Sequence, residues 1–191
     1  SPKQTHVSRL LVDYAASGAR VVRLKSGDPG IFGRLEEEIT ALRAAAIDFE
    51  IIPGVTSANA CASILGAPLA HDFLTLSLSD LLVPRETILE RAEAGGKGGF
   101  VSVLYNVQSS KRKEFIYEVL EKFKPFRSPQ TPCGVVSNAF RQNERKQIVA
   151  FEDLFSMQFD MLTTIVLGND ATRVIQNKMV TERGYSNVPE K

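Results

Sequence analysis

The chain has 191 residues, of which 43% are hydrophobic and 24% are charged, a composition typical of globular proteins. Its 23 basic and 22 acidic residues nearly cancel, so we expect no nucleic-acid or membrane partner. No apolar run approaches the roughly 20 residues of a spanning helix, and no charged-then-apolar leader opens the sequence. Cys61 and Cys133 have no neighbours at metal-ligand spacing, so we expect two idle thiols, no metal and a cytoplasmic location.

The first third of the chain alternates predicted helices with predicted strands. Apolar residues at helical spacing and helix-stopping glycines predict the helices, and short apolar runs predict the strands. The helices are predicted over 7–16, 35–46 and 56–65, and the strands over 20–24 and 49–52. This β-loop-α repeat predicts a parallel sheet with covering helices.

The rest of the chain continues in the same α/β manner. Strands are predicted over 74–78, 100–105, 133–136, 147–150 and 163–167. Helices are predicted over 84–92 and 111–123, and the glycines of 95–99 predict a flexible loop. We expect two α/β lobes, 1–69 and 70–191, with the boundary near 67–72.

Two glycine-containing loops follow the first two predicted strands. In "SGDPG" (26–30), Gly27 and Gly30 permit close approach of a ligand to the backbone, and Asp28 offers a carboxylate. In "PGVTSA" (53–58), Thr56 and Ser57 could bond a ligand or cap the next helix. Each loop by itself is equally typical of a tight turn, and neither matches a phosphate-binding or dinucleotide motif.

Taken together, "VVRLKSGDPGIFGR" and "AAIDFEIIPGVTSA" resemble the tetrapyrrole methyltransferases, which methylate uroporphyrinogen III and the precorrins with S-adenosylmethionine. The first sixty residues are most similar to the uroporphyrinogen-III C-methyltransferase branch. Later motifs are most similar to the precorrin-3B C17-methyltransferase branch: "LGAPLAHDF", "SLSDLLVPRETI", "VLYNVQSSKR", "TPCGVV" and "MVTERGY". Val107 and Glu182 stand where that branch has proline.

The resemblance implies the class III methyltransferase fold, with S-adenosylmethionine folded in a cleft between two α/β lobes. It implies that eight residues line the cofactor: Ser26, Gly27, Asp28, Ile31, Thr56, Ser57, Asn106 and Ala139. Ala139 stands where the family more usually has glycine. Members of the family are commonly homodimers.

A tetrapyrrole bears many carboxylates, so cationic side chains are expected around it. The candidate substrate-binding residues are Arg34, Ser79, Asp80, Arg85 and Arg112. A solvated surface role is the alternative for each arginine. We identify no catalytic base, because methyl transfer from a sulfonium needs placement more than covalent help.

Members of the family begin with a strand and a "GxGPG" loop ahead of the position of Ser1. We therefore expect the N-terminal lobe to lack its first strand and loop, to bind the cofactor weakly and to expose apolar surface unless a partner covers it. The predicted function is C17-methylation of precorrin-3B in cobalamin biosynthesis. The alternatives are uroporphyrinogen-III C-methylation, a catalytically silent module, and a relative that methylates ribosomal RNA or diphthamide, which the neutral charge argues against.

Overall fold

The computed structural model describes residues 4–109 and 112–183. The chain divides into two compact units, a first unit (1–56) and a second unit (57–191). Helix α3 (Ser57–Leu65) and the short strand β1 (Gly66–Ala67) therefore pack with the second unit, whereas the sequence boundary at 69/70 placed them in the first lobe. The predicted start of a helix at residue 111 and the end of the "MVTERGY" motif lie outside the described residues.

Two helices and two extended segments make up the first unit. Helix α1 (Gln4–Ala16) packs against helix α2 (Leu35–Ala44), whose first turn carries three glutamates at the favourable end of the helix dipole. The strands predicted over 20–24 and 49–52 are wrong, because both segments are extended but join no ladder among the described residues. A strand needs a hydrogen-bonded neighbour, and apolar β-branched residues alone cannot supply one. The parallel sheet predicted for this part of the chain is therefore not formed.

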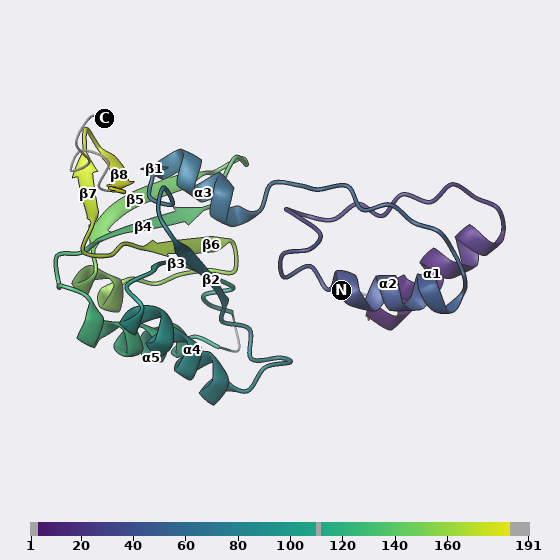
Figure 1. The fold of residues 1–191 in the computed structure, drawn as a ribbon, viewed down its shortest axis with the longest axis horizontal. Coiled ribbons are helices and arrows are strands. Elements are labelled where there is room, and N and C mark those ends of the chain that lie inside the picture. The colour runs from purple at the N-terminus through teal and green to yellow at the C-terminus, as the bar shows by residue number, and fades with distance from the viewer. Residues whose placement is uncertain (1–3, 110–111, 184–191) are drawn as a thin grey trace, which may run out of the picture. The chain divides into compact units, whose positions relative to one another are not determined.

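The second unit is built on a five-stranded mixed sheet (Figure 1). Its strands lie in the order β2 (Phe73–Ser77), β3 (Val101–Tyr105), β6 (Thr163–Leu167), β4 (Pro132–Ser137) and β5 (Arg145–Ala150). The β2–β3 pair is parallel, and the β3–β6, β6–β4 and β4–β5 pairs are antiparallel. Parallel strands need a long crossover, which helix α4 (Arg85–Lys97) provides between β2 and β3.

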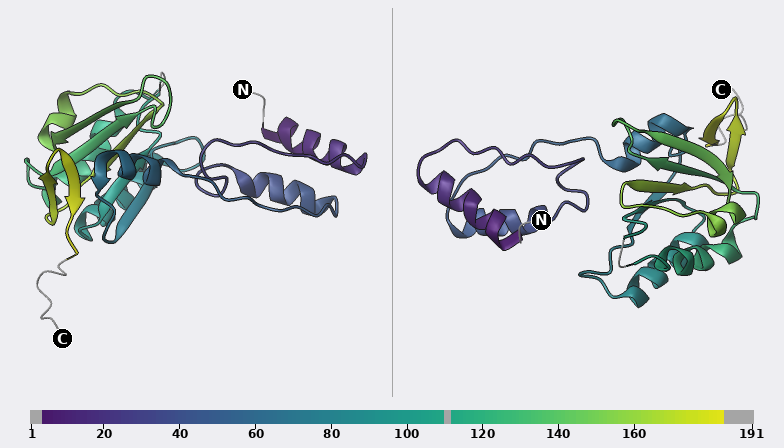
Figure 2. Two further views of the ribbon diagram at one scale, coloured as in Figure 1. Left: turned by 90° about the horizontal axis from the view of Figure 1, so that it is seen from above. Right: turned by 180° about the vertical axis from the view of Figure 1, so that it is seen from behind.

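Helices cover both faces of this sheet (Figure 2). Helix α4 and helix α5 (Phe115–Phe123) bury their apolar sides on one face. Two short 3-10 helices complete the second unit: η1 (Lys124–Phe126) directly follows α5, and η2 (Glu152–Ser156) follows β5. Helix α3 covers the other face, where Val101, Val103 and Tyr105 point toward it. Because both faces of β3 are covered, the strand is an unbroken buried run and lacks the alternation of a half-exposed strand.

Glycines in α4 allow that helix to approach the sheet closely. A Cβ on Gly95 would lie 2.5 Å from Leu74 Cδ2, and one on Gly96 would lie 2.8 Å from Phe126 Cδ2. The flexible loop predicted over 95–99 is therefore wrong for its first three residues, which are the last turn of α4. Gly95 and Gly96 leave room for packing neighbours in this structure, and Gly98 and Gly99 turn the chain toward β3.

A small second sheet contains elements that the sequence patterns missed. It has the order β1–β8 (Lys178–Thr181)–β7 (Thr172–Ile175), in which β1 and β8 are parallel and β7 and β8 form a hairpin. The two residues of the hairpin turn, Gln176 and Asn177, have φ of 48° and 59°. Two successive left-handed residues match the twist of the two strands, and asparagine favours this conformation. Asn177 was therefore the sequence feature that could have predicted the hairpin.

Candidate functional site

The two predicted ligand loops of the first unit lie against each other. The Asp28 carboxylate accepts a hydrogen bond from the Gly30 amide at 2.8 Å and another from the Gly54 amide at 3.0 Å. We call this two-sided contact the Asp28 bridge, because it joins the loop 26–30 to the loop that begins at Pro53. The bridge brings together two motifs that are more than twenty residues apart in the sequence.

Glycine is required where these loops cross. Gly27 has a φ of 71°, and a Cβ there would lie 3.6 Å from the Val55 carbonyl oxygen and 3.9 Å from Thr56 Cα. A Cβ on Gly54 would collide with the Gly27 carbonyl oxygen. The structure therefore places Gly27 beside Thr56, as a shared ligand-binding surface would need.

The other predicted cofactor residues of the first unit extend the same surface. Ser26 and Gly27 are exposed, and Ile31 is 42% exposed, with its amide donating to the Asp28 carbonyl at 3.3 Å. Hydrogen bonds from the Gly54 and Gly30 amides lower the pKa of Asp28, so the carboxylate is charged at neutral pH. Exposed glycine backbone next to an apolar side chain and a charged carboxylate fits a nucleoside-type cofactor.

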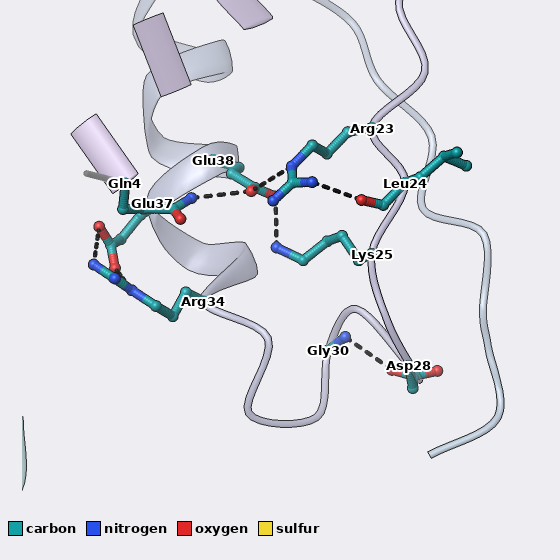
Figure 3. Close-up of polar contacts among 9 residues, drawn as sticks. All are labelled: Gln4, Arg23, Leu24, Lys25, Asp28, Gly30, Arg34, Glu37 and Glu38. Atoms are coloured by element: carbon teal, nitrogen blue, oxygen red, sulfur yellow. Dashed lines mark hydrogen bonds and ion pairs between the residues drawn. The ribbon is translucent and has the colours of Figure 1, made fainter. Parts of the chain in front are cut away.

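Arg34 is engaged by its own helix. Its guanidinium donates to both carboxylate oxygens of Glu37, at 2.6 and 3.0 Å, and both side chains are solvent-accessible (Figure 3). The hydrogen bond to Glu37 raises the pKa of Arg34. This exposed pair agrees with the alternative of an ordinary helix partner, so the substrate-binding role of Arg34 stays a prediction.

In the second unit, the predicted site residues lie at one edge of the sheet. β2, β3 and β4 end there and β6 begins there, because Ser77 is opposite Tyr105 and Ser137 is opposite Thr163. We call this the carboxyl edge. Ligands of α/β proteins bind beyond such an edge, where the loops after several strands meet.

A polar network ties the loops after β2 and β3 together. Asn106 has a left-handed φ of 54°, and its side-chain amide donates to Ser77 Oγ at 3.0 Å. Its carbonyl accepts a 2.8 Å hydrogen bond from Arg112 Nη2. The same Ser77 hydroxyl accepts from the Ser79 amide at 3.3 Å. The motif "SLSD" and the residues Asn106 and Arg112 of "LYNVQSSKR" therefore belong to one network.

Two arginines share Asp80 in this network. Arg112 Nε lies 3.2 Å from one oxygen of Asp80, and Arg85 Nε lies 3.5 Å from the other. Arg85 is also stacked on Phe115, with its guanidinium carbon 4.3 Å from the ring centroid. Arg112 is 8% exposed, and its Nη1 is buried without a hydrogen-bond partner in the described structure. Burial lowers the pKa of Arg112, an effect that Asp80 opposes.

The remaining two cofactor candidates are placed by the α3 face of the sheet. Ser57 opens α3 and is half-buried. Ala139 is half-buried against the core beneath α3, between Asn138 and Phe140, which both have left-handed backbone. None of these contacts requires the backbone amide of Ala139 to face a ligand, so the cofactor role of Ala139 stays a prediction.

Sequence reasoning missed Tyr105, the last residue of β3. Its hydroxyl accepts a 2.6 Å hydrogen bond from the Ala58 amide at the start of α3. The ring packs against α3, so this side chain ties the start of the helix that carries Ser57 to the end of the strand that precedes Asn106. A tyrosine at the end of an apolar strand needs a hydrogen-bond partner for its hydroxyl when it is buried, and this feature of the sequence could have identified Tyr105.

The carboxyl edge also exposes large apolar side chains. Leu81 and Leu82 follow β2, and Phe140 follows β4, with exposed fractions of 70% or more. Met161 and Leu162 precede β6, and the Leu162 carbonyl accepts from the Asn138 amide beside them. Apolar surface together with arginines suits a ligand that has both a flat apolar face and anionic groups.

The described residues hold no cluster of three or more His, Cys, Asp or Glu side chains arranged for a metal ion. Cys61 and Cys133 are both buried, and burial raises the pKa of their thiols to about 11 and about 12. Neither thiol is therefore a nucleophile at neutral pH. Within the part of the chain described, no helix combines the length and apolar character that crossing a bilayer requires.

The sequence profile of the Tetrapyrrole (Corrin/Porphyrin) Methylases matches residues 2–154. This chain belongs to the tetrapyrrole methylase family. The probable cobalt-factor III C(17)-methyltransferase of Methanocaldococcus jannaschii is 39% identical over 186 residues, which cover 91% of this chain and 75% of that protein. The cobalt-factor III methyltransferase of Priestia megaterium is 38% identical, and the match spans 91% of this chain but a third (33%) of that relative.

Solved tetrapyrrole methylases have the same fold. The methyltransferase CobJ superposes with a TM-score of 0.86 at 32% identity, covering 92% of this chain and 75% of CobJ. The uroporphyrin-III C-methyltransferase of Thermus thermophilus complexed with S-adenyl homocysteine superposes with a TM-score of 0.64 at 28% identity, covering 86% and 73%. The predicted class of fold, a mixed α/β tetrapyrrole methylase, is confirmed.

Proposed function

We propose that this chain carries an S-adenosylmethionine-dependent methyltransferase activity directed at C17 of a precorrin-3-level tetrapyrrole in cobalamin biosynthesis. The observation that carries the proposal is the superposition on CobJ over nine-tenths of the chain, at 32% identity. Relatives named for cobalt-factor III C(17)-methylation support the same ring position. The substrate in this proposal is the ring at this stage of synthesis, with or without its cobalt.

In this proposal the first unit binds the methyl donor through Ser26, Gly27, Asp28, Ile31 and Thr56. The exposed glycine backbone and the charged carboxylate of the Asp28 bridge support this assignment. S-adenosylmethionine supplies an activated methyl group when it is bound. The chain contributes placement, and proximity with correct orientation can be worth about 7–11 kcal/mol of the barrier.

The second unit, in the same proposal, contributes Ser57, Asn106 and Ala139 to the methyl donor and its carboxyl edge to the tetrapyrrole. Arg85 is an accessible cation there, and Ser79 and Asp80 lie next to it in the network. Arg112 is held by Asp80 and by the Asn106 carbonyl, so its contribution is to shape the loop that carries Asn106. The exposed apolar residues of the edge would face the ring.

Product analysis tests this function directly. The protein is incubated with S-adenosylmethionine and, in separate reactions, with cobalt-factor III, precorrin-3B and uroporphyrinogen III, and the products are identified by mass spectrometry. We expect one added methyl group on a precorrin-3-level substrate and none on uroporphyrinogen III. Methylation of uroporphyrinogen III alone would overturn the proposal in favour of the branch that includes the Thermus enzyme.

A catalytically silent tetrapyrrole-binding module is the second candidate. The unpaired apolar segments of the first unit favour it, because Val22 and Leu24, in a segment predicted to be a strand, are 74% and 81% exposed. Binding of a tetrapyrrole without methylation of any member of the panel would support this candidate. Calorimetric titration with S-adenosylhomocysteine separates the two, because a silent module would bind it weakly or not at all.

A homodimer in the cytoplasm is part of the same proposal, and its support is the family resemblance. Sedimentation equilibrium of the purified chain checks the oligomeric state. A single species of the mass of one chain at micromolar concentration would contradict the dimer.

A further inference from the structure

Among the described residues of the first unit, the most buried charge is the carboxylate of Glu38, which the proposed methyl-donor site does not use. Glu38 is 2% exposed and lies in the first turn of α2. It accepts hydrogen bonds from Gln4 Nε2 at 2.9 Å, from Arg23 Nε at 3.2 Å and from Lys25 Nζ at 2.8 Å (Figure 3). Three donors from two other parts of the chain thus converge on one acidic group.

The Lys25–Glu38 pair lies at the base of residues 26–34, which we call the glycine loop. Lys25 directly precedes Ser26, and Glu38 follows the end of the loop by one turn of helix. The Lys25 side chain is only 10% exposed, so the pair is largely shielded from water. The two ends of residues 26–34 are therefore held at a fixed separation by an ion pair that screening by salt affects little.

The interior of the loop depends on that separation. A Cβ on Gly33 would collide with the Pro29 carbonyl oxygen and would lie 3.4 Å from Lys25 Cε. Phe32 and Arg34 adopt left-handed backbone, with φ of 54° and 56°, which non-glycine residues tolerate only when their surroundings impose it. A tight, strained loop of this kind needs a firm base to present Gly27 and Asp28 in one position.

We propose that Glu38, acting through Lys25, is a positioning residue that holds the glycine loop 26–34 in the form that binds the methyl donor. This inference rests on the proposed function, because it takes the loop as the methyl-donor site. Burial of Glu38 raises its pKa, but the hydrogen bonds from Lys25 and Gln4 outweigh burial, so the pKa is lowered and the residue stays ionised. Gln4 and Arg23 add α1 and the preceding segment to the same anchor.

Three variants of the full chain and one control variant test the inference by calorimetric titration with S-adenosylhomocysteine. Glu38→Gln and Lys25→Met each remove one charge, and the double variant removes both. We expect about tenfold weaker binding for each single variant, because each leaves one buried charge of the Lys25–Glu38 pair without the other. We expect the double variant to bind more tightly than the worse single variant, since neither buried charge of the Lys25–Glu38 pair is left without the other, and Arg23, which also loses Glu38, is 40% exposed to water.

Glu36→Gln is the matched control. Glu36 lies in the same first turn of α2 and is exposed, so its removal costs a similar interaction with the helix dipole and leaves the Lys25–Glu38 pair in place. We expect its affinity to stay within twofold of the unaltered protein. Equal losses for Glu36→Gln and Glu38→Gln would overturn the inference, as would strictly additive losses in the double variant. Lys25→Met keeps the test decisive if Glu38→Gln does not fold.

Amide hydrogen exchange without any ligand separates this inference from the proposed function. We expect Glu38→Gln to speed exchange at Gly30 and Ile31, whose amides bond within the loop, and to leave the β3 amides unchanged. Unchanged exchange in the loop would overturn the positioning role even if the protein is a methyltransferase. Failure of the unaltered protein to bind S-adenosylhomocysteine would instead overturn the proposed function, and exchange alone would then decide the role of Glu38.

Where the chain is active, the kinetic parameters give a further readout. If Glu38 positions the methyl-donor loop, the Glu38→Gln variant should have a higher KM for S-adenosylmethionine and an unchanged KM for the tetrapyrrole. A general loss of folded protein would lower kcat alone. Restoration of the donor KM by the conservative variant Lys25→Arg, which keeps the ion pair, would support the inference further.

Discussion

At the scale of single residues, polar side chains in this structure hold loops in place. Tyr105 is the clearest case, because its hydroxyl accepts from the Ala58 amide and its backbone directly precedes Asn106. The Asp28 bridge does the same between Gly30 and Gly54. In both cases a side chain satisfies backbone donors of a second segment, so its removal should affect that segment more than its own.

Replacing Tyr105 by Phe removes only the hydroxyl. The buried Ala58 amide then loses its partner, so we expect the free energy of unfolding to fall by about 1–3 kcal/mol and S-adenosylhomocysteine to bind more weakly. Chemical denaturation and calorimetry measure the two effects. Tyr117→Phe is the control: it removes a comparable 2.7 Å hydrogen bond to the Met157 carbonyl, far in sequence from α3, and should leave the affinity unchanged.

The Asp28 bridge should be sensitive to acid. Its hydrogen bonds lower the pKa of Asp28 in the folded state, so its stabilising effect is complete above the unfolded value of about 3.9 and is lost as the pH falls through the lower folded value. We expect the amide resonances of Gly30 and Gly54 to shift together with a midpoint below pH 3.9 in an NMR titration. A midpoint at or above that value, or an identical titration in Asp28→Asn, would contradict the bridge.

At the scale of elements, close packing of helices on the sheet depends on small residues. Gly95 lets α4 approach Leu74 of β2, and Gly134 on β4 leaves room for the Leu65 side chain of α3. Glycine lowers the intrinsic stability of a helix or strand. At both positions this loss is offset by the closer packing of neighbouring apolar side chains.

Replacing Gly95 by Val should therefore destabilise the second unit. The new side chain would overlap Leu74 and push α4 away from β2, for which we expect a loss of about 1–3 kcal/mol in the free energy of unfolding. Ala94→Val is the matched control on the exposed side of the same helix turn, and it should cost less than about 1 kcal/mol through helix propensity alone. Equal effects of the two changes in urea denaturation would argue against close packing at Gly95.

At the scale of the whole molecule, apolar residues are used very differently in the two units. Those of β3 and β6 and most of those of α5 are buried, whereas Leu24 and Ile52 on the extended segments of the first unit are 81% and 66% exposed. Burial needs an opposing apolar layer, which α3, α4 and α5 provide for the sheet of the second unit. The two extended segments lack a strand partner in the described residues and remain accessible.

Leu24→Lys and Ile52→Lys test this exposure. Since both side chains face solvent, we expect each change to alter the free energy of unfolding by no more than about 0.5 kcal/mol and to reduce binding of a hydrophobic dye. The control is Leu104→Lys on β3, a fully buried position, which should prevent stable folding. A loss of 2 kcal/mol or more for Leu24→Lys would mean that this surface is covered in solution.

The predictions from sequence succeeded where local patterns coincide with tertiary partners. The apolar run of β6 and the amphipathic side of α5 are buried as their patterns predicted. The runs at 20–24 and 49–52 are just as apolar, yet strand pairing is a property of two segments and no local pattern reveals its absence. The same reasoning explains why Gly95 was taken for a loop residue: a glycine that permits close packing is identical in sequence to one that breaks a helix.

The site follows the same division. The amino-acid order by itself determined the family, because several spaced motifs from "SGDPG" to "LYNVQSSKR" are specific in combination. Only the tertiary structure revealed that Asp28 bridges two loops, that the buried Arg112 donates to the Asn106 carbonyl, and that Lys25 and Glu38 form one ion pair. The physical reason is that a motif records which groups are present, whereas their hydrogen-bond partners are chosen by segments that folding brings together from distant parts of the chain.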